Sequence, residues 1–180
     1  QTLLDLYTIQ KEFGKLEGHK IAFVGDLKYG RTVHSLVKAL THFGAKMYFV
    51  APETLQMPKY ILDDLAKLGI EYELLTDYRE IMGEIDIFYM TRIQRERFPD
   101  DEEYEKVKGV YILTKEDVVG KAKEDMIILH PLPRVNEIAT NLDDTKHALY
   151  FKQAANGVPV RQALLSLALG YKAKLVEGDK

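Results

Sequence analysis

Three short segments carry the residues with the clearest chemical potential, and each directly follows an apolar run. They are Gly25 to Thr32 (GDLKYGRT), Met90 to Gln94 (MTRIQ) and His130 to Arg134 (HPLPR). Each segment contains one arginine, whose guanidinium presents a planar fork of donors that fits a carboxylate or a phosphate. The three segments are therefore the first candidates for an anion-binding site.

The first segment is close to the phosphate-binding consensus G-x-x-x-x-G-K-[ST], but Arg31 stands where that consensus has lysine. Asp26 would add negative charge to a phosphate cradle, and no apolar strand ends in an aspartate for Mg²⁺, since Asp86 is expected inside its strand. The dinucleotide consensus G-x-G-x-x-G is also absent. These differences argue against nucleotide binding by this segment. In the simplest alternative, Gly25 and Gly30 only permit a tight turn and Arg31 is solvated.

Arg31 is nevertheless expected at the start of a helix, where a cation is unfavourable unless an anion binds there too. The second segment adds the guanidinium of Arg92 and the amide of Gln94. Two guanidiniums and an amide suit a small dianion with two carboxylates, or with a carboxylate and a phosphate. The alternative is that residues 92–97 form an ordinary solvated run of charges.

The third segment has two prolines within three residues, which remove two amide donors and stiffen the backbone. Carbonyls held in this way are suitable acceptors for an amine or amide ligand. A lone histidine after a strand is more often structural than catalytic, and for His130 a buried polar contact and a catalytic role both stay open at this point. The other histidines show no metal-ligand spacing with carboxylates, and no metal site is predicted.

Short apolar runs alternate with amphipathic stretches along the chain. The apolar runs predict strands at 21–24, 46–50, 71–75, 85–89 and 126–129. Helical periodicity predicts helices at 1–13, 33–40, 60–68, 77–83, 114–119 and 153–169. The last helix has an apolar side made of Leu164, Leu165, Leu167 and Ala168. The charged stretch 91–108 contains Phe98-Pro99 and is expected to be partly loop, and the polar tail from Lys172 is expected to fray.

This alternation predicts an α/β fold: a doubly wound, mostly parallel five-stranded sheet with helices on both faces, as in Rossmann-like proteins. Ligands of such sheets bind just outside the carboxyl ends of the strands. The three segments follow the first, fourth and fifth predicted strands, so the fold is expected to place them at one edge.

The 180 residues include 25 Lys+Arg and 28 Asp+Glu, giving a net charge of −3, which argues against a nucleic acid partner. The absence of cysteine excludes thiol catalysis and disulfides. No apolar run approaches the ~18 residues of a membrane span and no signal peptide is evident, which predicts a cytoplasmic protein without a membrane partner. The chain opens on Gln1 within a helical pattern, so we expect the longer protein to continue upstream.

The three segments closely resemble the aspartate carbamoyltransferase family, together with QTLLD at 1–5 and RQALL at 161–165. The resemblance runs over essentially the whole chain. It implies transfer of a carbamoyl group from carbamoyl phosphate to the α-amine of L-aspartate, giving N-carbamoyl-L-aspartate and phosphate in pyrimidine synthesis. This chemistry implies no cofactor, because the protein only positions and stabilises the reactants.

The resemblance also implies two groups of site residues. The aspartate carboxylates are held by Arg31, Arg92 and Gln94. The carbamoyl phosphate side is formed by Gln1, Leu132 and Pro133. The loop that carries the last two is supported by His130 and Arg134.

The resemblance further implies that residues 1–180 are a single aspartate-binding domain, opened by a helix from Gln1 to Phe13. The upstream carbamoyl phosphate domain, with its Ser-x-Arg-Thr loop, is missing, so the isolated chain is expected to be inactive. The native catalytic chain is expected to form a homotrimer that shares its sites, with regulatory chains as a further class of partner.

Two alternatives stay open. An ornithine carbamoyltransferase would share the fold, but it typically has a cysteine where this chain has His130 to Leu132, and its site suits a cationic side chain. A non-catalytic partner domain of the same fold is the other alternative, and turnover by the longer native chain would discriminate between them.

Overall fold

The computed structural model describes residues 1–98 and 100–171. Its sheet consists of β1 (Lys20–Val24), β2 (Lys46–Val50), β3 (Tyr72–Leu75), β4 (Ile87–Met90) and β5 (Ile127–Leu129). All neighbouring strands are parallel, in the order β3-β2-β1-β4-β5. The chain builds outward from β1 to β3 and then returns to the other side of β1. This arrangement confirms the predicted α/β fold and makes the β1–β4 boundary the switch point where ligands bind.

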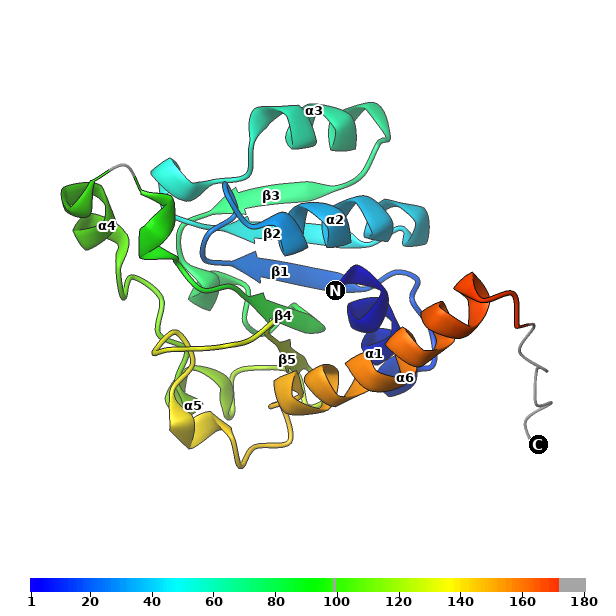
Figure 1. The fold of residues 1–180 in the computed structure, drawn as a ribbon. Coiled ribbons are helices and arrows are strands. Elements are labelled where there is room, and N and C mark those ends of the chain that lie inside the picture. The colour runs from blue at the N-terminus through cyan, green and yellow to red at the C-terminus, as the bar shows by residue number, and fades with distance from the viewer. Residues whose placement is uncertain (99, 172–180) are drawn as a thin grey trace.

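Six α-helices accompany the sheet in the described ranges (Figure 1). They are α1 (Thr2–Phe13), α2 (Arg31–Leu40), α3 (Lys59–Lys67), α4 (Asp101–Val107), α5 (Lys115–Val118) and α6 (Tyr150–Ala168). Helices α1, α2 and α3 pack on one face of the sheet, and α6 runs along α1 (Figure 1). None of these helices is both long enough and apolar enough to span a membrane.

Alternation along the strands gives the sheet two apolar layers. In β1, Ile21 and Phe23 face the layer of α1, α2 and α3, whereas Ala22 and Val24 face the opposite layer. The opposite layer contains Tyr78, α5 and the segment from Ile138 to Leu142. Because both faces are covered, β1, β2, β4 and β5 are almost entirely buried and apolar, as their continuous apolar runs predicted. The edge strand β3 is only partly buried and contains Glu73.

The predicted helix at 77–83 is wrong. Only Tyr78–Glu80 forms a single 3₁₀ turn, capped by the Asp77 carboxylate, which accepts from the Arg79 amide at 2.9 Å. The chain then turns so that Ile81 and Ile85 enter the core. The expected position of Asp86 inside a strand is also wrong, because it precedes β4 and its carboxylate accepts from the Lys20 amide at 2.8 Å.

Helix α4 lies in the stretch that was expected to be partly loop. Its N-terminus is capped by the Asp100 carboxylate, which accepts from the Glu103 amide at 2.8 Å. Helix α6 begins at Tyr150, earlier than predicted, and its expected apolar side does not pack on the core. The side chains of Leu165 and Leu167 are 65% and 64% exposed. Two expectations, on Pro99 and on the tail from Lys172, fall outside the described residues.

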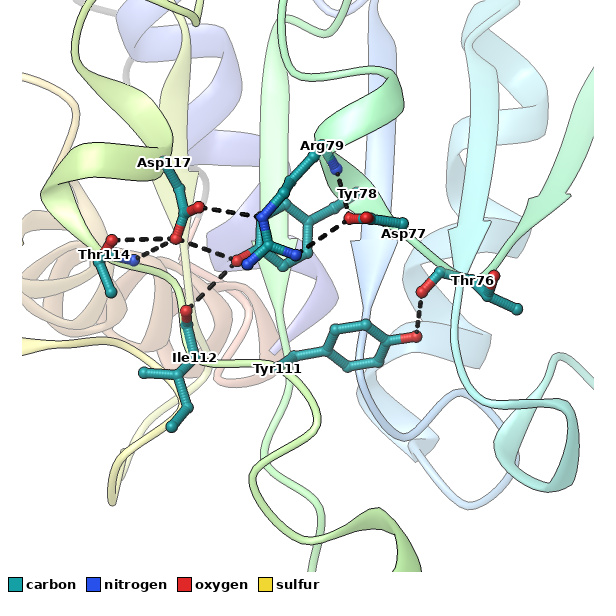
Figure 2. Close-up of polar contacts among 8 residues, drawn as sticks. All are labelled: Thr76, Asp77, Tyr78, Arg79, Tyr111, Ile112, Thr114 and Asp117. Carbon is teal, nitrogen blue, oxygen red and sulfur yellow. Dashed lines mark hydrogen bonds and ion pairs between the residues drawn. The ribbon is translucent and has the colours of Figure 1, made fainter.

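A partly buried polar cluster joins Thr114 and α5 to the turn after β3 (Figure 2). One Asp117 carboxylate oxygen accepts from the Thr114 amide at 3.1 Å and from the Tyr78 hydroxyl at 3.1 Å. The other accepts from Arg79 Nε at 3.2 Å. Burial raises the pKa of Asp117, but these hydrogen bonds outweigh it, and the net pKa lies below its usual value.

We expect Asp117→Asn to destabilise the fold at pH 7 by about 1–3 kcal/mol. The NH₂ group of asparagine takes the place of a carboxylate oxygen that accepts hydrogen bonds, and the negative charge of the cluster is lost. A lowered pKa contributes stability that is present above the unfolded value near 4 and is lost as the pH falls through the folded value. Urea unfolding should therefore show a difference in unfolding free energy between the parent and Asp117→Asn at pH 7, and that difference should be smaller at pH 3. Asp64→Asn, which alters an exposed pair with Lys67, is the control and should change stability by less than about 0.5 kcal/mol. A difference for Asp117→Asn that stays constant with pH would contradict this account.

Candidate functional site at the switch point

The loop after β1 places a cation at the start of α2. The Asp26 carboxylate accepts from the Tyr29 amide at 2.9 Å and closes the turn, while the buried side chain of Leu27 anchors it. Gly30 is the N-cap, and Arg31 is the first residue of α2 with an exposed side chain. Burial raises the pKa of Asp26, although the Tyr29 hydrogen bond and nearby cations oppose this.

Thr91 connects this loop to the loop after β4. Its amide donates to the Val24 carbonyl at 2.8 Å, and its hydroxyl accepts from the Asp26 amide at 2.9 Å. Gly25 lies against Thr91 with φ +116°, and a Cβ at Gly25 would come within 2.5 Å of the Thr91 carbonyl oxygen. Only glycine fits this contact, which holds the ends of β1 and β4 together.

The structure brings the three predicted aspartate-side residues into one pocket of about 140 Å³. The pocket is lined by Arg31, Arg92 and Gln94 together with Asp26, Gly30, Thr32, Thr91 and Arg97. Arg92 is partly buried, and its Nη2 lies 3.3 Å from a Glu96 carboxylate oxygen. Arg97 donates to the Tyr29 carbonyl and so joins the two loops. Three guanidiniums against one carboxylate make this pocket suitable for an anion with more than one charge.

The loop after β5 is held by its own histidine. His130 is buried, its Nδ1 accepts from the Leu132 amide at 2.8 Å, and its Nε2 lies 2.8 Å from a Glu137 oxygen. Because Nδ1 is an acceptor, the ring proton of the neutral form is placed on Nε2, facing the carboxylate. Leu132 has φ +53° and is followed by a cis peptide bond to Pro133. The two ring nitrogens of His130 thus contact the loop backbone and Glu137, and its supporting role stays a prediction.

Burial raises the pKa of Glu137, but the bonds from His130 and from the Val135 amide outweigh it and lower the pKa overall. The carboxylate is therefore charged at neutral pH and fixes the orientation of the imidazole. Glu137 also lines a second pocket, of about 270 Å³, together with Gly25 and Thr91. This pocket adjoins the first one at Thr91 and extends the site toward the third loop.

Arg134 differs from Arg31 and Arg92 because its guanidinium is held by side chains of the fold. Its Nη1 and Nη2 each lie 2.5 Å from an oxygen of Asp143, and Nη1 also donates to the Tyr150 hydroxyl at 3.2 Å. The guanidinium stacks over the rings of Tyr150 and Phe151. Arg134 thus connects the third loop to the start of α6, and the guanidiniums that line the 140 Å³ pocket come from the first two loops.

Gln1 lies at the start of α1, with an exposed side chain whose Nε2 donates to the Asp5 carboxylate at 2.7 Å. The next residue, Thr2, donates to the Ser35 hydroxyl of α2 at 2.7 Å. The start of α1 is thus fixed against the helix that carries Arg31. In the described ranges, no group of three or more potential ligands is arranged to hold a metal ion.

A family model described as aspartate/ornithine carbamoyltransferase, Asp/Orn binding domain, matches residues 17–168. The chain therefore belongs to the aspartate/ornithine carbamoyltransferase family, in its amino-acid-binding domain. Among curated relatives, the aspartate carbamoyltransferase catalytic subunit of Brachyspira hyodysenteriae is 57% identical over 93% of this chain and 47% of its own length. The corresponding subunit of Thermococcus kodakarensis is 56% identical over 94% of this chain and 54% of its own length.

Solved structures show the same relationship. The catalytic subunit of aspartate transcarbamoylase from M. jannaschii aligns with a TM-score of 0.88 at 53% identity, covering 95% of this chain and 56% of that one. The Trypanosoma cruzi enzyme in complex with carbamoyl phosphate and aspartate aligns with a TM-score of 0.84 at 38% identity, covering 91% and 54%. The chain spans about half the length of the relatives it matches.

Proposed function

We propose that residues 1–180 form the aspartate-binding domain of an aspartate carbamoyltransferase. The longer protein transfers the carbamoyl group of carbamoyl phosphate to the α-amine of L-aspartate and releases N-carbamoyl-L-aspartate and phosphate. The observation that carries this proposal is the single pocket lined by Arg31, Arg92 and Gln94 at the sheet's switch point. The names of the relatives and the ligands in the Trypanosoma cruzi structures support it.

The pocket explains how aspartate is oriented. Two guanidiniums, from Arg31 and Arg92, provide paired donors for the two carboxylates, and the Gln94 amide adds a neutral donor. The ion pair between Arg92 and Glu96 limits the directions that the Arg92 fork can take. With both carboxylates fixed, the α-amine is directed toward the carbamoyl carbon, and much of the rate acceleration comes from this orientation.

The third loop supplies fixed polar groups next to the reacting atoms. His130 and Arg134 hold it from two sides, so the backbone at Leu132 and Pro133 is arranged before the substrates bind. As the amine attacks, the carbonyl oxygen gains negative charge and phosphate departs. The phosphate itself can take the proton of the amine, so this domain needs no dedicated base. Gln1 faces the carbamoyl phosphate side.

Carbamoyl phosphate needs more cations than the pocket has left after binding aspartate. We therefore propose that the remaining cations come from an upstream domain and from a neighbouring subunit of a homotrimer, which regulatory chains can accompany. The enzyme acts in the cytoplasm and uses no cofactor. On this account the isolated domain binds a dicarboxylate but does not transfer the carbamoyl group.

The test is turnover by the full-length catalytic chain. With carbamoyl phosphate present, we expect carbamoylation of L-aspartate and none of L-ornithine, because three guanidiniums outnumber the single carboxylate in the pocket and disfavour a cationic side chain. Equal or faster carbamoylation of ornithine would contradict the assignment. Absence of turnover with either amino acid, in a folded oligomer, would favour a non-catalytic partner domain.

A further inference from the structure

A buried carboxylate lies where α1, β4 and α6 meet. The Asp5 side chain is 0% exposed. Its Oδ1 accepts from the side-chain amides of Gln1 at 2.7 Å and Gln153 at 2.6 Å, and its Oδ2 accepts from the Tyr89 hydroxyl at 3.0 Å. These three hydrogen-bond partners are neutral, and burial raises the pKa of Asp5 to about 6. A buried acid with neutral partners is unfavourable for stability, so its presence in α1 calls for another explanation.

The side-chain amides of Gln1 and Gln153 connect Asp5 to the proposed active site. Gln1 is one of the residues on the carbamoyl phosphate side. The second amide, Gln153, donates to Asp5 and uses its own oxygen to accept from the His130 amide at 2.8 Å. His130 in turn accepts from the Leu132 amide at 2.8 Å. One continuous chain of hydrogen bonds therefore joins Gln1 to the third loop, with Asp5 at its centre.

The ionised carboxylate also determines which way each amide points. A carboxylate can only accept, so both glutamines must turn their NH₂ groups toward it. The carbonyl oxygen of Gln1 is then directed away from Asp5, and the oxygen of Gln153 is directed to the His130 amide. A group that could both donate and accept would permit either orientation of each glutamine.

The same two helices are also joined one turn further on, at Asn156, whose side-chain oxygen accepts from Lys11 Nζ of α1 at 3.5 Å. The Asn156 side chain of α6 donates to the Thr8 hydroxyl of α1 at 3.0 Å, and Thr8 donates to the Leu4 carbonyl at 2.7 Å. Thr8 and Asn156 are both buried. The contact between Thr8 and Asn156 thus links α1 to α6 by a route that leads to neither Gln1 nor the third loop.

We propose that Asp5 is a positioning residue for the carbamoyl phosphate side of the site. It fixes the Gln1 carboxamide and, through Gln153, the first amide of the third loop relative to each other. This inference rests on the proposed function for the roles of Gln1 and the third loop. Arg31, Arg92 and Gln94 make no hydrogen bond to this chain of residues among the contacts of the described segments, so aspartate binding should depend on Asp5 less than carbamoyl phosphate binding does.

Steady-state kinetics of the full-length catalytic chain test the inference. Asp5→Ala should raise KM for carbamoyl phosphate and lower kcat, each by about tenfold or more, while KM for aspartate changes less than about threefold. Asp5→Asn keeps the size of the side chain but can both donate and accept, so it no longer fixes the orientation of the two glutamines. It should change KM for carbamoyl phosphate and kcat in the same direction as Asp5→Ala but by less, with KM for aspartate within about threefold of the parent. Thr8→Val removes the matched neutral link between the same helices and should stay within about threefold of the parent in all three constants.

Equal increases in the two KM values, or the same losses in Thr8→Val as in Asp5→Ala, would show that Asp5 only supports packing. If Asp5→Ala does not fold, Gln153→Leu cuts the link to His130 alone. Gln153→Leu should lower kcat by about tenfold and change KM for carbamoyl phosphate by a smaller factor. Parental kinetics in that variant would overturn the inference.

Backbone NMR of the 180-residue chain gives a readout that does not depend on turnover. The His130 and Leu132 amide signals and the Gln1 side-chain signals should move in Asp5→Ala and remain in place in Thr8→Val. Unmoved signals in Asp5→Ala would contradict the positioning role. If the full-length chain fails to carbamoylate aspartate while these signals still move together, the proposed function fails and the hydrogen-bond chain stands.

Discussion

Arg92→Ala in the full-length catalytic chain should lower kcat/KM for aspartate by at least about 100-fold. One charge-assisted hydrogen bond contributes about 1.5–3 kcal/mol, a paired fork makes two of them, and 1.4 kcal/mol corresponds to about tenfold. Binding of carbamoyl phosphate should change far less, because Arg92 lines the pocket of the first two loops. Steady-state kinetics with each substrate varied in turn measure both effects.

Two further variants make this prediction specific. Arg92→Lys should not restore activity, since a point charge cannot replace a planar fork. Arg95→Ala is the matched control, because Arg95 is exposed and paired with Asp101 at 2.7 Å outside the pocket. We expect that control to stay within about threefold of the parent. Near-parental aspartate kinetics in Arg92→Ala or Arg92→Lys would exclude Arg92 from the site.

Gly25→Ala should destabilise the domain by about 3 kcal/mol or more. Overpacking costs about 1–3 kcal/mol and a side chain at positive φ costs about 1–2 kcal/mol. At Gly25 both apply, because φ is +116° and the Cβ would meet the Thr91 carbonyl oxygen at 2.5 Å. The backbone at Gly25 and Thr91 cannot move apart without separating the loops that carry Arg31 and Arg92. Dicarboxylate binding should therefore weaken as well.

Gly44→Ala separates the two contributions. Gly44 also has positive φ, at +59°, but a Cβ there would have nothing within 4 Å. Urea unfolding should show a loss of only about 1–2 kcal/mol for this control. Equal losses in the two alanine variants would mean that the contact between Gly25 and Thr91 does not constrain the site.

Strands β1, β2, β4 and β5 could be predicted from the sequence because they are buried on both faces and form continuous apolar runs. The edge strand β3 is partly exposed and has a weaker apolar pattern. Helix α4 could not be predicted, because its residues are mostly charged and lack an apolar periodicity. The Asp100 cap and the acidic first turn were the signals available for it. The turn at 78–80 was misread as a longer helix because its apolar residues have helical spacing but enter the core by a change of direction.

The position of Arg31, Arg92 and Gln94 at one edge of the sheet could be predicted from the sequence, because parallel strands end at one edge and each loop follows a strand directly. Their role toward aspartate came only from the family resemblance. Asp5 and Gln153 could not be located from strand ends in this way. They are 148 positions apart, and their contact depends on α6 packing along α1. An acidic residue between Leu4 and Leu6 in a helix that begins with apolar residues was the only local signal for Asp5.

The central claim is that the first two loops form a dicarboxylate site, and an NMR titration of the 180-residue chain with succinate tests it most directly. We expect shifts of the signals of Arg31, Arg92 and Gln94 and a millimolar Kd, about −4 kcal/mol, because water screens cations in an open pocket. Acetate at equal ionic strength should leave these signals unchanged. Equal responses to succinate and acetate would show a generic basic edge and contradict the claim.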